Sequence, residues 1–166
     1  MNDPVNNLDL LGLFAYAERN GNNLNIIIPI IFNGPGATKS VINKFTTAIE
    51  KKWTGTFGKF NVTTKVVNPS DVPGSEINYV YIPKGNGKAH VFINQFGCIQ
   101  AQRPGGTAAH EGGHFMFLRD KYDKKTGKPL PGYKNNIMGN INGVPFEEDI
   151  ENILILNEPL NKKAFR

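Results

Sequence analysis

The residues that most limit the fold of this chain are the apolar run LNIIIPIIF at positions 24–32. Apolar, largely β-branched residues at successive positions are typical of a β-strand that is covered on both faces. The run is interrupted by Pro29 and falls far short of the ~20 apolar residues that span a bilayer. We therefore predict a buried strand with protein on both sides of it.

The length of 166 residues fits a single globular domain with its own hydrophobic core. One cysteine, Cys98, cannot form an internal disulfide, so the fold has to hold without covalent cross-links. Lysine and arginine total 19 against 14 aspartates and glutamates, and the resulting net charge of +5 is too modest to indicate a partner. No secretory signal peptide is predicted, because a basic segment followed by an apolar stretch is lacking at the start.

Hydrophobic periodicity predicts three helices and three further strands. The first helix, capped by Thr38 or Ser40, is predicted to extend through Trp53, and the second covers residues 107–118. The remaining elements are strands at 57–67, 77–82 and 89–94, and a third helix with Phe146, Ile150, Ile153 and Leu154 on one side. Their order predicts an α+β fold with a mixed β-sheet.

The second predicted helix contains the sequence His110-Glu111-Gly112-Gly113-His114, which fits the pattern H-E-x-x-H. Histidines four residues apart lie on one helix face, so both imidazoles can reach one metal ion. Glu111 lies at the flank of that face, where it can act as the general base that takes a proton from a metal-activated water. These residues predict a catalytic Zn²⁺ site.

A catalytic zinc site usually has three protein ligands and one water, so a third ligand is needed. Asp120, six residues after His114, occupies the third-ligand position of H-E-x-x-H-x-x-G-x-x-H/D. If the helix continued regularly to Asp120, the aspartate would lie about 80–120° around the helix from the histidines. In that case an acid at the start of the last helix, represented by Glu148, would be the third ligand, and His90 is a further alternative.

The sequence resembles the metzincin metallopeptidases over most of residues 24–156. The resemblance rests on the strand and helix order, on His110, Glu111, His114 and Asp120, and on the later sequence NIMG at 136–139, which is similar to a Met-turn. It implies a metzincin-like fold with an active-site helix, a Met-turn and a C-terminal helix, and it implies that Met138 forms an apolar floor under the metal ligands. The segment at 89–94 is similar to the cleft-edge strand that holds an extended peptide substrate in this family.

Two residues depart from the metzincin pattern. Phe117 stands where the family has the glycine at which the chain leaves the helix, and Asn140 stands where some members have a tyrosine after the Met-turn. Tyr133 is then a candidate for stabilising the negative charge that develops on the substrate. The stretch from His110 to Met138 looks closer still to the metallopeptidase domains at the tips of bacterial polymorphic toxins.

Residues 2–13, NDPVNNLDLLGL, resemble the end of the Rhs core, P-x-x-x-x-D-P-x-G-L, with Leu10 in place of the second proline. The resemblance implies that residues 1–13 end an Rhs shell that cleaves itself after Leu13 and that residues 14–166 are a toxin cargo. It further implies a type VI secretion effector delivered into a target cell, where a monomeric zinc endopeptidase acts on a cytoplasmic protein. A cognate immunity protein and the Rhs shell are the expected partners, and neither nucleic acid nor a membrane is expected.

Two alternative functions remain open from the residues alone. Because the chain is basic, a metal-dependent nuclease toxin is one alternative, although two imidazoles favour zinc over the hard carboxylate sites of Mg²⁺. The other is a non-catalytic zinc-stabilised binding module, which would need a closed site with four ligands. Replacing Glu111 separates these readings, because a binding module should lose nothing.

Overall fold

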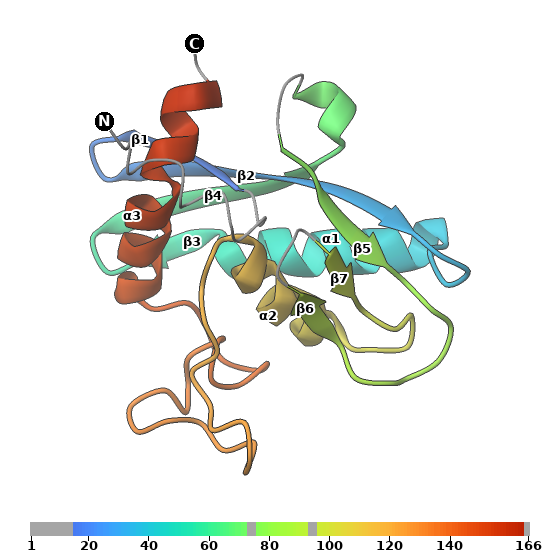
Figure 1. Cartoon of the computed structure of the whole chain (residues 1–166). Coiled ribbons are helices and arrows are strands. Elements are labelled where there is room, and N and C mark those ends of the chain that lie inside the picture. Colours follow the sequence, from blue (N-terminus) through green and yellow to red (C-terminus); the bar gives the residue numbers. More distant parts are fainter. Residues whose placement is uncertain (1–14, 73–75, 93–95, 165–166) are drawn as a thin grey trace, which may run out of the picture.

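The computed structural model describes residues 15–72, 76–92 and 96–164, so the Rhs-like segment at 1–13 and its cleavage position lie outside the described residues. The chain forms an α+β fold with a mixed sheet and three α-helices (Figure 1). In chain order the elements are β1 (Tyr16–Asn20), β2 (Asn23–Asn33), α1 (Lys39–Trp53), β3 (Gly55–Phe57), β4 (Phe60–Val67), the 3-10 helix η3 (Pro69–Asp71), β5 (Asn78–Tyr81), β6 (His90–Phe92), β7 (Phe96–Cys98), α2 (Gly105–Phe115) and α3 (Glu147–Ala164).

Strand β2 is the centre of the sheet, whose main order is β3-β4-β2-β5-β7-β6. Its first half pairs in antiparallel fashion with β1 and in parallel with β4, and its last residues pair in parallel with β5. Strand β7 continues the sheet parallel to β5, and β6 pairs with β7 in the antiparallel direction. The sheet therefore ends, on the side of β6, in an antiparallel edge strand.

The two faces of β2 are not equally covered. Leu24, Ile26, Ile28 and Ile30 are at most 4% exposed, and they form the centre of the core. Ile27, on the opposite face, is only half-buried. The prediction of a strand covered on both faces is therefore correct for one face and only partly correct for the other.

Helix α1 packs against the covered face of the sheet and also against α2. The hydroxyl of Thr38 accepts a hydrogen bond from the amide of Val41 (3.3 Å), which confirms the predicted cap. Phe45, Ile49 and Trp53 recur every four residues and are fully buried. The indole Nε1 of Trp53 donates to the carbonyl of Ala109 in α2 (2.8 Å), so the core of the first helix also fixes the position of the second.

The strand predicted at 57–67 is in fact a hairpin. Strand β3 ends at Phe57, which pairs with Phe60, and Gly58 in the turn has a positive φ of 57°. The Lys59 ammonium, in the same turn, lies 2.6 Å from the Glu151 carboxylate of α3. The turn therefore links the sheet to the last helix.

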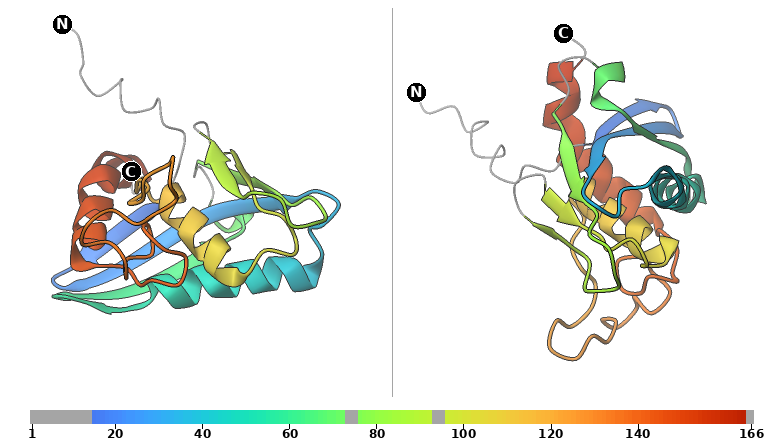
Figure 2. Two further views of the ribbon diagram at one scale, coloured as in Figure 1. Left: turned by 90° about the horizontal axis from the view of Figure 1, so that it is seen from below. Right: turned by 90° about the vertical axis from the view of Figure 1, so that its right-hand side faces the viewer.

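The chain between α2 and α3 has no helix or strand and forms a long loop that extends away from the sheet (Figures 1 and 2). Helix α3 returns from this loop to pack beside β1. Among the described residues, no helix combines the length and the apolar character that crossing a membrane requires.

Candidate metal centre

Helix α2 carries the H-E-x-x-H sequence and ends at Phe115, three residues before the predicted end. Its C-terminus is a Schellman turn: the Leu118 amide donates to the Gly113 carbonyl (3.0 Å), and the Phe117 amide donates to the His114 carbonyl (2.9 Å). Phe117 takes the left-handed position of this turn, at φ 69°. Glycine is the usual residue there, because a side chain is strained in this conformation. The prediction of a helix through Leu118 was therefore wrong, and the chain leaves the helix at Phe117 without a glycine.

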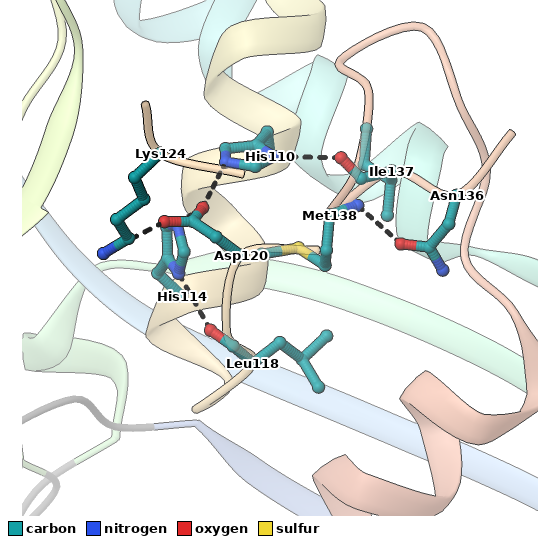
Figure 3. Close-up of polar contacts among 8 residues, drawn as sticks. All are labelled: His110, His114, Leu118, Asp120, Lys124, Asn136, Ile137 and Met138. Atoms are coloured by element: carbon teal, nitrogen blue, oxygen red, sulfur yellow. Dashed lines mark hydrogen bonds and ion pairs between the residues drawn. The ribbon is translucent and has the colours of Figure 1, made fainter. Parts of the chain in front are cut away.

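The turn brings Asp120 back over the helix face that carries the two histidines (Figure 3). Asp120 Oδ1 lies 3.3 Å from His110 Nε2 and 3.2 Å from His114 Nε2. One ligand atom from each of the three residues lies within 4.8 Å of the other two. The exposed ammonium of Lys124 lies 3.6 Å from the second oxygen, Asp120 Oδ2.

The hydrogen bonds of the histidines fix which ring nitrogen faces the centre. His110 Nδ1 lies 2.9 Å from the Ile137 carbonyl oxygen, and His114 Nδ1 lies 2.8 Å from the Leu118 carbonyl oxygen. A carbonyl only accepts, so each Nδ1 carries a proton and, in the neutral ring, each Nε2 has a lone pair. Both lone pairs point toward the Asp120 carboxylate, whose Oδ1 is buried with no hydrogen-bond donor among the described residues. Three acceptors that converge in this way fit a metal ion bound between them.

The charges of these groups are coupled. Burial raises the pKa of Asp120, but the two histidine rings, when protonated, outweigh burial through hydrogen bonds and charge and hold this pKa well below its usual value. Burial lowers the pKa of His110, yet the Asp120 carboxylate and the Ile137 carbonyl reverse the shift, so that this pKa is raised. The aspartate therefore stays ionised and supplies a negative charge for a cation.

Glu111 lies next to the three candidate ligands and is 5% exposed. Its Oε2 atom is buried and has no hydrogen-bond partner among the described residues. Burial raises the pKa of this carboxyl, although the nearby His114 and His110 oppose the shift. Glu111 and His110 line a cleft of about 460 Å³. A carboxylate with a raised pKa at such a cleft can accept a proton from a water molecule there.

Met138 is fully buried beside α2. Its sulfur lies against the Cα of Gly113, so closely that a Cβ there would overlap it. The Met138 amide donates to Asn136 Oδ1 (2.7 Å), and Asn136 Nδ2 donates to the buried Asp149 of α3 (2.6 Å). The turn that holds Met138 is therefore fixed to the last helix, and Met138 supplies an apolar contact under the helix that carries the histidines.

Glu148 does not join the group. Its carboxylate accepts a hydrogen bond from the Tyr133 hydroxyl (2.7 Å) and lies 3.5 Å from the Lys121 ammonium, at the exposed surface. Among the described residues, the group that could hold a metal consists of His110, His114 and Asp120, so His90 on β6 is outside it as well. Of the alternatives considered for the third ligand, the structure brings only Asp120 to the two histidines.

Tyr122 lies in the cleft, and sequence analysis did not give it a role. Its ring centroid is 6.0 Å from that of His110, and it lines the cleft with Glu111. Burial, the charge of Asp120 and a hydrogen bond to Asp120 raise its pKa, so the phenol keeps its proton at neutral pH. Tyr133, the residue expected to stabilise negative charge, is instead bonded to Glu148. The sequence signal that points to Tyr122 is its position two residues after Asp120, since extended chain places such residues on one side.

Comparison with known proteins assigns no family to the chain, because no family model, no curated protein and no solved structure matches it.

Proposed function

We propose that this chain is a zinc-dependent endopeptidase that uses Glu111 as its general base. The observation that carries the proposal is the convergence of His110 Nε2, His114 Nε2 and Asp120 Oδ1 beside the buried, unpartnered Glu111 carboxylate. This arrangement offers three protein ligands and a base, and one ligand, His110, lines a cleft together with Glu111. Catalytic zinc sites have the same composition: three protein ligands and one position open to water or substrate.

The donor set favours zinc over magnesium. Two imidazole nitrogens suit zinc, whereas magnesium prefers oxygen ligands and ideal octahedral geometry. When bound, zinc lowers the pKa of a coordinated water toward neutrality and polarises a carbonyl group. The carbonyls of Ile137 and Leu118 orient the two rings from the far side, as second-layer partners of zinc-binding histidines commonly do.

The protein's own groups then have distinct tasks. Glu111 Oε2 accepts the proton of the attacking water and passes it to the leaving amine. The Tyr122 hydroxyl donates a hydrogen bond to the oxygen on which negative charge develops, since the phenol stays protonated beside the cleft. Asp120 remains ionised as a ligand, because the histidines keep its pKa low.

The substrate is an extended peptide segment. Strand β6 ends the sheet, and among the described residues it pairs only with β7. Ala89, just before β6, lines the cleft. An edge strand can pair with the main chain of a peptide and place its bonds along the cleft.

The wider biological role belongs to the same proposal. Residues 14–166 are a metzincin-like peptidase with Met138 under its ligands, and they are the toxin cargo of an Rhs-type effector that meets a cognate immunity protein. The Rhs-like sequence at residues 2–13 and the metallopeptidase sequence from His110 to Met138 support this role.

The decisive experiment compares new protein N-termini in bacterial cells that express the chain with those in cells that express Glu111→Gln. Glutamine keeps the volume of the side chain but cannot take a proton, so we expect a discrete set of cleavages that disappears in the variant. Glu147→Gln, an acid of α3 paired with Lys59, is the matched control and should cleave as the wild type does. Toxicity without any Glu111-dependent cleavage would overturn the proposal and direct attention to nucleic-acid damage.

The ligand assignment has a separate test. Zinc content after dialysis should be one ion per chain in the wild type and in Glu148→Gln, and it should fall well below one in Asp120→Asn. Zinc retained by Asp120→Asn and lost by Glu148→Gln would show that Asp120 is not the third ligand.

A further inference from the structure

Two cations, Lys88 and Arg103, line the same cleft as His110 and Glu111. They come from two separate loops: Lys88 precedes β6 and Arg103 precedes α2. Within the described part of the chain, neither forms an ion pair with a carboxylate, and the acid that lines the same cleft is Glu111. The cleft wall therefore carries two cations without an ion-pair partner among the described residues.

Arg103 is held in place from two sides. Its Nε donates to the Gly87 carbonyl (2.7 Å), which ties it to the loop that carries Lys88. On its main-chain side, Lys44 Nζ donates to the carbonyls of Ala101 (2.8 Å) and Arg103 (3.0 Å). The Nε bond is the only hydrogen bond of this guanidinium among the described residues. The two terminal nitrogens are thus available, in a fixed position, for a carboxylate.

The spacing along α2 places these cations relative to the metal centre. Helix α2 begins at Gly105, two residues after Arg103, and His110 lies five residues further along. At 1.5 Å per residue this corresponds to about 8 Å along the axis. An extended peptide advances about 3.3 Å per residue, so the start of α2, which Arg103 precedes, lies about two to three substrate residues along from His110.

We propose that Arg103 and Lys88 form an acidic-residue subsite, which selects peptide segments with aspartate or glutamate about two to three residues from the scissile bond. The subsite rests on the endopeptidase function proposed above, because it deepens the assignment of that same cleft. A nucleic-acid phosphate would also satisfy two cations. The endopeptidase function proposed above favours a peptide, and β6 is the last strand in the order of the sheet, where the main chain of a peptide, unlike a polynucleotide backbone, has N–H groups to offer.

Cleavage profiling tests the subsite. The zinc-loaded full chain is incubated with a denatured bacterial proteome, and the residues around each cleaved bond are read by mass spectrometry. A good substrate peptide is then made in matched glutamate and glutamine forms at the selected position. We expect kcat/KM to be about tenfold higher for the glutamate peptide, which corresponds to about 1.4 kcal/mol.

Variants assign the preference to the two cations. Arg103→Gln and Lys88→Gln should each remove most of the preference, mainly by lowering kcat/KM for the glutamate peptide, while the glutamine peptide changes less than twofold. Arg103→Lys keeps the charge and should keep part of the preference. Lys84→Gln, an exposed lysine of the same loop that does not line the cleft, should leave the preference unchanged. Thermal unfolding of each variant checks that the loop before α2 remains folded.

The outcomes separate the subsite from the proposed function. Absence of any Glu111-dependent cleavage removes both. Glu111-dependent cleavage without acidic preference, or a preference that survives in Arg103→Gln and Lys88→Gln, overturns the subsite and leaves the peptidase standing. Binding of a 12-nucleotide RNA to the Glu111→Gln protein, tighter than binding of the glutamate peptide at physiological salt and lost in Arg103→Gln, would assign the cations to nucleic acid instead.

Discussion

Helix α2 and the loop of residues 116–146 both contribute to the candidate metal centre, but the protein holds them in different ways. We call α2 the helix half of the centre. There, Gly112 lies against Ile49 of α1, and the Ala109 carbonyl accepts a hydrogen bond from Trp53. In the loop half, residues 116–146, the Lys121 amide donates to the Met138 carbonyl (2.8 Å) and the Leu130 amide to the Lys121 carbonyl (2.8 Å). Side-chain packing thus fixes the helix half, and main-chain hydrogen bonds fix the loop half.

The difference indicates that the helix half of the centre is rigid and that the loop half can adapt its position. The helix half gives the two histidines and Glu111 from a buried surface that packs against the core. The loop half gives Asp120 from a segment without helix or strand, and the side chains of Asp120 and the histidines approach one another across the boundary. An ion bound to this group, as proposed, would join the two halves, so its removal should affect them unequally.

Metal removal should produce the largest effect. With free zinc at a thousand times its dissociation constant, binding stabilises the folded chain by about 4 kcal/mol, so chelation should lower the unfolding midpoint by roughly 10 °C. Hydrogen exchange measured with and without chelator should show faster exchange at Lys121 and Asp123, whose amides donate to the Met138 and Lys128 carbonyls, and little change at Ala108 and Ala109. Equal loss of protection in both halves would contradict the idea that the ion joins a stable half to a less stable one.

A pair of glycines, one in each half, should show the next largest effect. A Cβ at Gly139, in the loop half, would overlap the main-chain carbonyl of Tyr133, whereas a Cβ at Gly113, in the helix half, would overlap the flexible thioether of Met138. We expect Gly139→Ala to cost about 3 kcal/mol. Gly113→Ala should cost about 1 kcal/mol, because Met138 can move and alanine is the better helix former.

Urea unfolding of the two alanine variants measures this difference directly. Gly113→Ala should also weaken zinc binding, since the displaced Met138 packs against the helix that carries the histidines. A larger loss of unfolding free energy in Gly113→Ala than in Gly139→Ala would contradict this expectation. It would mean that the helix half, which side-chain packing fixes, tolerates an added methyl group less well than the loop half.

Two acids, Glu111 in the helix half and Asp123 in the loop half, should give the smallest effects, with opposite signs. Burial raises the pKa of Glu111 above its ordinary 4.5, so its charged form costs stability at pH values above the folded pKa and nothing well below 4.5. Hydrogen bonds from the Thr126 and Lys125 amides lower the pKa of Asp123 below its ordinary 3.8, so Asp123 stabilises above that pH and loses the effect in acid.

Unfolding of the chelated proteins at pH 7 and pH 3 tests these signs. At pH 7, Glu111→Gln should be more stable than the wild type and Asp123→Asn less stable, and both differences should shrink in acid. A Glu111→Gln protein that is less stable at pH 7 would mean that the carboxylate has a partner in the folded chain.

The sequence predicted much of this architecture because its signals are local. The run at 24–32 predicted β2, and the spacing of Phe45, Ile49 and Trp53 predicted α1. The hairpins of β1 with β2 and of β3 with β4 were missed, although Gly21 and Gly58 mark their turns with positive φ values of 61° and 57°. Short strands of this kind depend on pairing with β2 and β4, and that pairing has no periodic signal of its own.

The part of the site that lies on a helix was predictable from the sequence. The part that lies in the loop was left undecided. The spacing of His110 and His114 follows from helix geometry alone. The choice between Asp120 and Glu148 depended on where α2 ends, and Phe117 carries no sequence signal for the left-handed conformation that ends it. Tyr122 was missed for the same reason, since its direction is set by a main-chain bridge to Pro129 within the loop.

The Schellman turn at Phe117 has a consequence for the order of folding. Because this turn returns the chain at once, all three metal donors lie within residues 110–120. Closing so short a loop costs little entropy, far less than assembling a parallel sheet from strands many residues apart. If the group binds zinc as proposed, the ion would capture this segment while the strands are still unpaired and would act early, as a nucleus around which α2 forms before it docks on α1.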